Sequence, residues 1–106
     1  MAVAWGVLIV SGCLETLWAT ALEASRNFHR LGPSLLFLAA LACSMAGLSY
    51  AVSHIPLGTA YAVWVGIGAV GTAVYGMAAL GEPATVARLL CLLLIVAGVV
   101  GLKLIP

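Results

Sequence analysis

One carboxylate lies in the middle of an apolar run, and this position suggests a role in binding ions or protons. Glu15 is the only charged residue between positions 3 and 22. A charged side chain at the centre of a membrane span costs roughly 2.5–3.5 kcal/mol on insertion scales, and such residues usually handle ions or protons. We therefore expect Glu15 to bind protons and a cation. The alternative is a protonated Glu15 that only hydrogen-bonds a neighbouring helix.

Small and aromatic residues lie at helical spacing around this carboxylate. Gly12 lies one turn before Glu15, and Trp18 lies one turn after it. A small neighbour leaves space for a ligand. The indole face of Trp18 suits a cation, since a desolvated cation–π contact contributes about 2 kcal/mol or more. A packing or interfacial role explains Trp18 equally well.

A second aromatic group follows in the third apolar run. Its members are 3, 4 and 7 positions apart and share one helix face: Tyr61, Trp64, Gly68 and Tyr75. Such a stripe alone usually indicates packing, but beside a central carboxylate it favours an aromatic-walled cation site. Tyr75 also suits an anchor near the membrane interface. Ser44, midway along the second run, is placed to donate a hydrogen bond to Glu15, although most intramembrane serines bond their own helix.

The composition of the chain indicates that apolar helices position these residues. The chain has 106 residues, of which 65% are hydrophobic and 7% charged, whereas soluble domains carry about 25% charged residues. A membrane span needs roughly 20 residues, so four spans and short links use the whole length. Charges and prolines at 33, 56 and 83 divide the chain into spans at about 3–22, 33–52, 58–80 and 84–104. The fold class is therefore a single all-α membrane domain.

Several classes of function are excluded by composition. The net charge is +1 and no basic patch exists for nucleic acid. Cys13, Cys43 and Cys91 are an odd number of cysteines in apolar runs without a Cys-x-x-Cys pair, which predicts core residues and no metal site. No nucleophile–base pair or cofactor motif is present, so we expect no cofactor and no enzyme activity.

Two motif matches are weaker than the membrane-helix interpretation. Residues 10–13 resemble a lipoprotein attachment site, but no Lys or Arg precedes the apolar run. The glycines at 66, 68 and 71 have dinucleotide-binding spacing, but that motif needs a preceding strand and an acidic residue about 20 positions later. Close packing or a local helix bend explains Gly66 and Gly68 better.

The chain also predicts a dimer. Four thin helices with one central carboxylate cannot easily enclose a pathway alone. On the fourth run, Cys91, Gly98 and Ile105 recur at intervals of seven, which suggests a packing seam. Leu94 and Gly101 lie between them. Lipid-facing leucines with incidental glycines are the alternative. Positive charge is spread so evenly that orientation is weakly fixed and dual insertion is allowed.

The chain resembles the small multidrug resistance family over essentially its whole length. The resemblance rests on residues 12–19, residues 56–64 and the glycine-rich run through Gly71. Within the family, residues 66–72 and 81–85 are similar to the guanidinium-exporter subtype.

The resemblance implies a four-helix, proton-coupled exporter in a bacterial plasma (inner) membrane, with protons and small organic cations as partners. It also implies an antiparallel, dual-topology dimer held by the fourth helix, and a kink in the third helix at Gly66 and Gly68. Glu15 would be the central carboxylate, and the residues lining its site would be Gly12, Trp18, Ser44, Tyr61 and Trp64.

Two departures from the family pattern keep other functions open. Glu23 stands where the family usually has a lysine, and Val65 where a small hydroxyl residue is common. They leave open export of quaternary ammonium or other lipophilic cations, and a heteromeric pair in place of a homodimer. A non-transporting membrane scaffold is the alternative of a different class, and it predicts that Glu15→Gln is tolerated.

Electrostatics gives the expected mechanism. Desolvation and like-charge repulsion disfavour ionisation of two Glu15 carboxylates that share one cavity, so the pair takes up protons. A cation displaces those protons when it binds. Guanidinium can donate paired hydrogen bonds to a carboxylate and stack on an aromatic face, whereas a quaternary ammonium has no N–H donor and depends on aromatic faces.

Overall fold

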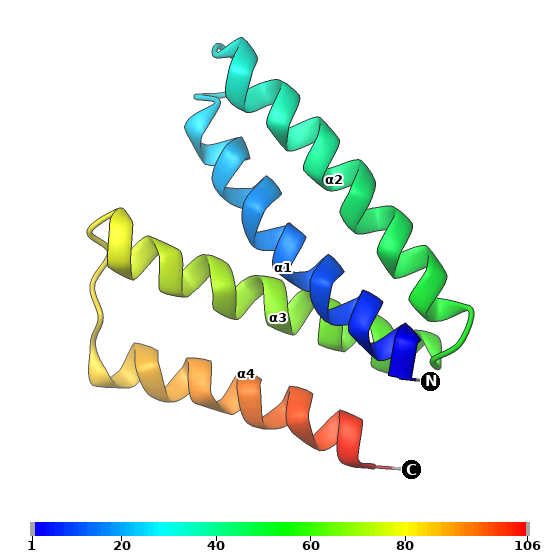
Figure 1. Cartoon of the computed structure of the whole chain (residues 1–106). Coiled ribbons are helices and arrows are strands. Elements are labelled where there is room, and N and C mark those ends of the chain that lie inside the picture. The colour runs from blue at the N-terminus through cyan, green and yellow to red at the C-terminus, as the bar shows by residue number, and fades with distance from the viewer. Residues whose placement is uncertain (1, 106) are drawn as a thin grey trace.

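The chain folds into four α-helices. The structure is a computed structural model that describes residues 2–105. In chain order the helices are α1 (Ala2–Ala24), α2 (Leu31–Val52), α3 (Leu57–Ala79) and α4 (Val86–Leu104), shown in Figure 1. Each helix is long and apolar enough to cross a membrane, and residues 2–105 contain no strand. The chain is thus a multi-pass, all-α membrane protein, which confirms the expected fold class.

Two helix starts differ by two residues from the positions expected from the sequence, and the other two differ by one. Helix α2 begins at Leu31 and carries Pro33 in its first turn, where the missing N–H of proline costs no intrahelical hydrogen bond. Helix α4 begins at Val86, after Thr85. The Thr85 hydroxyl accepts a hydrogen bond from the Arg88 backbone N–H at 3.2 Å and so caps the helix.

The helices form two pairs that diverge (Figure 1). Helices α1 and α2 run antiparallel and side by side, and α4 runs antiparallel beside α3. Helix α3 crosses α1 between the N-terminal end and the middle of α1, and Glu15 lies against Gly68 at the edge of this crossing. From that crossing, the pairs spread apart toward the end that carries the α1–α2 and α3–α4 links. The bundle is therefore closed at one end and open at the other.

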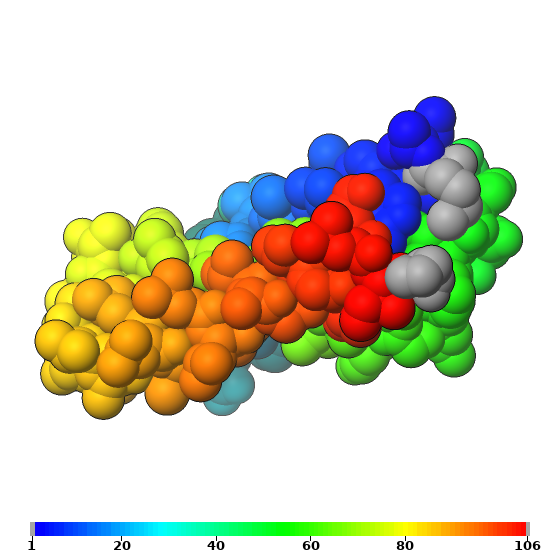
Figure 2. Space-filling model, turned by 90° about the horizontal axis from the view of Figure 1, so that it is seen from below, coloured from blue at the N-terminus to red at the C-terminus, as the bar shows by residue number. Residues whose placement is uncertain are grey.

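The core sits at the closed end. The buried residues come from the start of α1, the end of α2, the short link and the start of α3: Ala4, Leu8, Leu48, Ala51, Ile55, Ala60, Val63 and Trp64. Three alanines in this set let the helix backbones approach closely. Helix α4 contributes no buried residue to the described chain, and its outer surface lies uncovered across the face seen in Figure 2.

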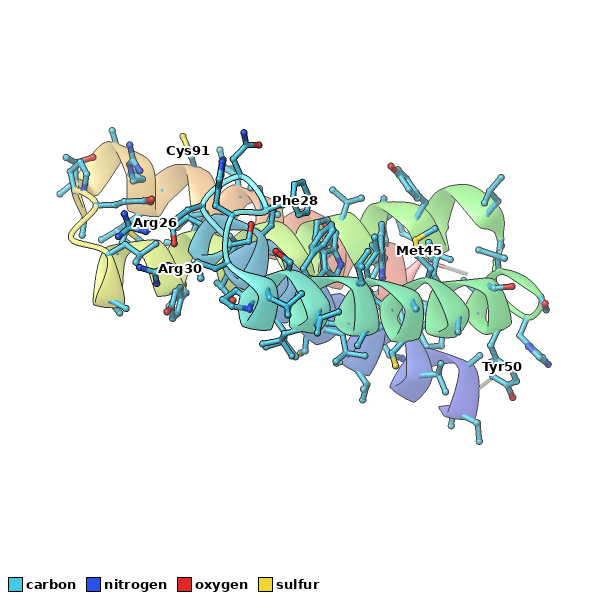
Figure 3. All side chains as sticks on the ribbon, turned by 90° about the horizontal axis from the view of Figure 1, so that it is seen from above. Arg26, Phe28, Arg30, Met45, Tyr50 and Cys91 are labelled. Carbon is cyan, nitrogen blue, oxygen red and sulfur yellow. The ribbon has the colours of Figure 1, made fainter. Side chains whose placement is uncertain are left out.

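The α1–α2 link is a tight left-handed turn. Arg26, Asn27 and Phe28 have φ of 50°, 61° and 68°, a conformation uncommon outside glycine. The buried Ser25 hydroxyl holds the turn, because it donates to the Leu22 carbonyl at 2.7 Å and accepts from the Phe28 N–H at 3.2 Å. Figure 3 shows Arg26, Phe28 and Arg30 together at this link, at the opposite end of α2 from Tyr50.

Candidate functional site

The Glu15 carboxylate lies directly on the backbone of α3. A Cβ atom placed on Gly68 would collide with the Glu15 carboxylate, and Gly68 is buried. A glycine at this position leaves room for the acidic side chain where it lies. The close approach of α1 to α3 therefore determines where the carboxylate lies.

Further small residues hold α1 against α3 at this crossing. A Cβ on Gly12 would lie 2.8 Å from the Ile67 Cβ, and a Cβ on Gly71 would collide with the Thr16 hydroxyl. The Thr16 hydroxyl also donates to the carbonyl of Gly68 at 3.4 Å. Membrane helices associate through such close backbone contacts and interhelical hydrogen bonds. Contacts of α1 with α3 thus lie both before Glu15, at Gly12, and after it, at Thr16, and together they hold the Glu15 carboxylate in place.

Glu15 lines a groove of about 430 Å³ between α1, α3 and the α3–α4 link. All three acidic residues of the chain line this groove: Glu15, Glu23 and Glu82. Its hydroxyl groups come from Thr20, Thr72 and Tyr75, and alanine, glycine and leucine form the rest. Lys and Arg are absent from this lining. A groove with this lining suits a cation.

One oxygen of Glu15 has no partner. Oε2 is shielded from solvent, and no hydrogen-bond donor reaches it among residues 2–105. Buried polar atoms in proteins are nearly always hydrogen-bonded, and an exception calls for an explanation such as a missing proton or ligand. A proton or a cation with N–H donors satisfies this oxygen.

Trp18 lies outside the groove and packs toward α2. Its ring meets the ring of Phe37 edge-on, with centroids 5.9 Å apart. Its indole Nε1 is buried and has no hydrogen-bond partner among residues 2–105. Within one chain, Trp18 therefore supports the α1–α2 contact and is absent from the lining of the Glu15 groove.

Ser44 ties three helices together, and the expected hydrogen bond to Glu15 is wrong. The Ser44 hydroxyl donates to the carbonyl of Ser11 at 2.7 Å and accepts from the Trp64 indole N–H at 3.1 Å. Ser44 is fully buried, and Trp64 is 6% exposed. A buried polar network is stable only when every member is satisfied, so this network fixes α2 and α3 on α1.

The two aromatic residues at the start of α3 do not form a wall around Glu15. Tyr61 is 54% exposed and lies 5.9 Å, centroid to centroid, from Trp64, which points into the core. Neither residue lines the groove, whereas Tyr75 at the other end of α3 does. The site residues expected from the sequence are therefore divided, within one chain, between the groove, the packed interior and, for Tyr61, the exposed surface.

The glycines of α3 serve close packing in this conformation. Helix α3 is continuous from Leu57 to Ala79. A Cβ on Gly66 would lie 2.6 Å from Val99 of α4, just as Gly68 makes room for Glu15 of α1. The two glycines thus let α3 contact both neighbouring helices. The kink that the resemblance implies stays a prediction.

The expected seam on α4 faces away from the rest of the chain. Leu94 is 73% exposed, and a Cβ on Gly98 or Gly101 would meet nothing within 4 Å. Cys91 is exposed and projects from the outer side of α4 (Figure 3). This face is free to contact another molecule or lipid.

Most groove residues were not predicted as part of the site, and the polar ones among them include Glu23, Thr72 and Glu82. Glu23 follows Glu15 at twice the i, i+4 interval, so helical spacing carried a signal for it. Thr72 follows Gly68 by one turn in the same way. Glu82 had no such signal, because it reaches the groove from the link by folding over Gly76, where a Cβ would collide with its carboxylate.

The family to which the chain belongs is shown by comparison with known proteins. Residues 3–95 match the family model described as "Small Multidrug Resistance protein". The chain belongs to the small multidrug resistance family. The match includes α1, α2, α3 and the first half of α4, so every groove residue lies within it.

Similar members of the family carry a more specific name. A protein named "Guanidinium exporter" from Yersinia pseudotuberculosis is 54% identical over 101 residues, which are 95% of this chain and 97% of the relative. Proteins of the same name from Salmonella typhimurium LT2 and Citrobacter freundii are 53% and 55% identical over 100 residues, 94% of this chain and 95% of each relative. These names describe transporters, which confirms the expectation that the chain is not an enzyme.

Proposed function

We propose that the chain exports guanidinium or small substituted guanidinium cations across a bacterial inner membrane in exchange for protons. The observation that carries the proposal is Glu15, a carboxylate with one unpartnered oxygen that lines a groove between membrane-spanning helices. The relatives named "Guanidinium exporter", which align over almost the whole chain, support the choice of substrate.

The groove lining favours a cation that donates hydrogen bonds. A guanidinium can give two parallel N–H bonds to the Glu15 carboxylate and still has N–H groups left for other acceptors. Thr20, Thr72 and Tyr75 supply hydroxyl oxygens in the same groove. A quaternary ammonium cannot use these acceptors and relies on aromatic faces, of which the described lining offers Tyr75 alone. The lining therefore supports guanidinium over quaternary ammonium.

Exchange follows from competition for one carboxylate. Glu15 either holds a proton or contacts the cation, because each removes the negative charge that the other needs. Ionisation without either partner is disfavoured at a site shielded from water. If the empty, ionised transporter switches sides slowly, each proton that enters releases a cation to the outside. The proton gradient then drives export.

A second copy completes the transport unit in this proposal. The outer face of α4, which carries Cys91, Leu94, Gly98 and Gly101, is apolar and uncovered. An antiparallel arrangement of two copies makes the inward-open and outward-open forms equivalent after the copies exchange roles. It also brings two Glu15 residues to one pathway. We propose a homodimer, and a heteromeric pair is the alternative.

Current recordings on solid-supported membranes test the proposal. The purified chain is reconstituted and given guanidinium, methylguanidinium or tetramethylammonium under a proton gradient. We expect currents with the two guanidinium compounds, and loss of these currents in Glu15→Gln. Glu82→Gln removes a carboxylate from the same groove and should retain transport. Undiminished coupled transport by Glu15→Gln contradicts the mechanism, and currents with tetramethylammonium alone move the substrate to quaternary ammonium.

A further inference from the structure

A second carboxylate lies on the same wall of the groove as Glu15. Glu15, Ala19 and Glu23 are spaced at i, i+4 and i+8 on α1, and all three line the groove. Eight residues of helix span about 12 Å along the axis. Between the two carboxylates the wall carries the small side chain of Ala19, so a small cation meets no bulky obstacle on α1 between Glu23 and Glu15.

No ion pair among residues 2–105 accounts for Glu23. It lies in the last turn of α1, where a negative charge is unfavourable because it faces the negative end of the helix dipole. That turn contains no basic residue, and no ion pair involves Glu23 among residues 2–105. An exposed carboxylate in this position does not stabilise the helix that carries it.

The third groove carboxylate differs in this respect. Glu82 faces Arg88 at 3.9 Å in the one ion pair found within residues 2–105. It also folds over Gly76 at the turn that follows α3. The negative charge of Glu82 is thus opposed by the positive charge of the Arg88 side chain, and the Glu82 side chain packs on the turn. Of these two carboxylates, Glu23 is the one without an ion pair among residues 2–105.

We propose that Glu23 is the entry residue for the cation, which it concentrates at the mouth of the groove and passes along α1 to Glu15. This inference rests on the proposed function. A cleft lined by one sign of charge raises the local concentration of the opposite ion and its rate of association. Glu23 therefore lowers the KM for guanidinium, and it leaves the maximal rate unchanged because Glu15 alone exchanges the cation for the proton.

The test measures KM and maximal current for guanidinium at low and high salt. At low salt, we expect Glu23→Gln to raise KM roughly two- to tenfold, the range given by one unit charge about 12 Å away at an effective dielectric between that of a protein surface and that of water. The maximal current should stay unchanged. Glu23→Asp should keep a KM near that of wild type, and Glu23→Lys should raise KM further.

Salt and a matched variant distinguish the groove from the general surface. Above about 0.1 M salt the Debye length falls below about 10 Å, so the difference between wild type and Glu23→Gln should shrink. Arg26→Gln removes one charge from the neighbouring exposed link, at a residue that does not line the groove. We expect Arg26→Gln to change KM much less than Glu23→Gln does. All values are normalised to the amount of folded, reconstituted protein.

Each outcome decides the matter. An unchanged KM in Glu23→Gln at low salt overturns the entry role while wild-type transport keeps the proposed function intact. A lower maximal current with the same KM also overturns it, because Glu23 would then act in the conformational switch. An equal and opposite effect of Arg26→Gln shows a general surface charge and overturns it too. A wild-type chain without guanidinium transport overturns the proposed function, and the inference falls with it.

Discussion

Helix α4 and the unit formed by α1, α2 and α3 are both apolar, yet they use their surfaces differently. The first three helices bury a core and share the Ser11–Ser44–Trp64 network. Helix α4 has no buried residue and leaves large side chains such as Leu93 and Leu94 exposed. Hydrophobicity alone therefore does not determine what a membrane helix packs against. Helices α1 to α3 position the carboxylate, and α4 remains available for a partner.

The same contrast appears at the glycines. A Cβ on Gly68 would strike the Glu15 carboxylate, whereas one on Gly98 would find open space. Where α1 crosses α3, the glycines are required by neighbours within the chain. On α4, they leave a shallow surface for a neighbour outside it. Substitutions at matched positions test this difference.

The largest effect is expected at the α1–α3 crossing. Gly68→Ala places a methyl group where the Glu15 carboxylate lies, and overpacking of this kind costs about 1–3 kcal/mol. We expect guanidinium currents to fall about tenfold or more, because Glu15 must move from its position. Gly58→Ala is the control on the same helix, since a Cβ there meets nothing within 4 Å. Equal currents in the two variants would mean that Gly68 does not position Glu15.

A smaller effect, of a different kind, is expected on α4. Gly98→Leu adds a side chain that meets nothing in the chain itself, so thermal stability of the monomer should not change. The dimer should weaken about tenfold, which corresponds to about 1.4 kcal/mol. Sedimentation equilibrium in detergent measures this association. Gly6→Leu, at an equally open glycine on α1, should leave the dimer intact. Unaltered dimerisation of Gly98→Leu would show that the α4 seam does not form the dimer contact.

The hydrogen-bond network of the three-helix unit gives the next effect. Ser44→Ala deprives the Trp64 indole N–H of its acceptor and the Ser11 carbonyl of its donor. We expect a loss of about 1 kcal/mol in unfolding free energy, in the range for hydrogen bonds between membrane helices. Thermal unfolding followed by tryptophan fluorescence measures it. Ser53→Ala removes an exposed hydroxyl that bonds its own helix and should be neutral. Identical stability in both variants would argue that the network contributes nothing.

The smallest effect is expected where α4 reaches α1. The Lys103 ammonium lies 5.0 Å from the centre of the Trp5 ring, and an exposed cation–π contact contributes about 0.5–1 kcal/mol. Lys103→Gln should lower thermal stability by no more than that, and Lys103→Arg should preserve it. A much larger loss in Lys103→Gln would show that α4 is anchored to α1, and the contrast between the two regions would fail.

Local patterns in the sequence were sufficient to predict the four helices and to single out Glu15. Four apolar runs separated by charges and prolines predicted four membrane helices, because crossing a bilayer demands a minimum length of apolar helix. Glu15 was recognisable because a carboxylate within such a run is costly. Both inferences depend on a short window of residues, and neither needs to know how the helices are rotated.

Contacts between helices depend on how each helix is rotated about its axis, and the sequence alone did not predict which side chains meet. Ser44 was expected at Glu15 but bonds Ser11. Trp64 was expected to line the site of Glu15 but points into the core. Glu15 instead lies against Gly68 of the same helix. A rotation of one helix by a single residue moves a side chain by about 100° around the axis, so spacing alone names a face without saying which neighbour it meets.

The four membrane helices and the central carboxylate are thus properties that can be read from the chain alone, since each follows from the cost of placing particular groups in lipid. The folded arrangement was needed to bring Glu82 into the groove with Glu15 and to leave α4 without a buried face. The physical reason is that these arrangements arise from close packing at glycines far apart in the chain. Which helices approach one another depends on the packing of whole surfaces, and no local pattern contains that information.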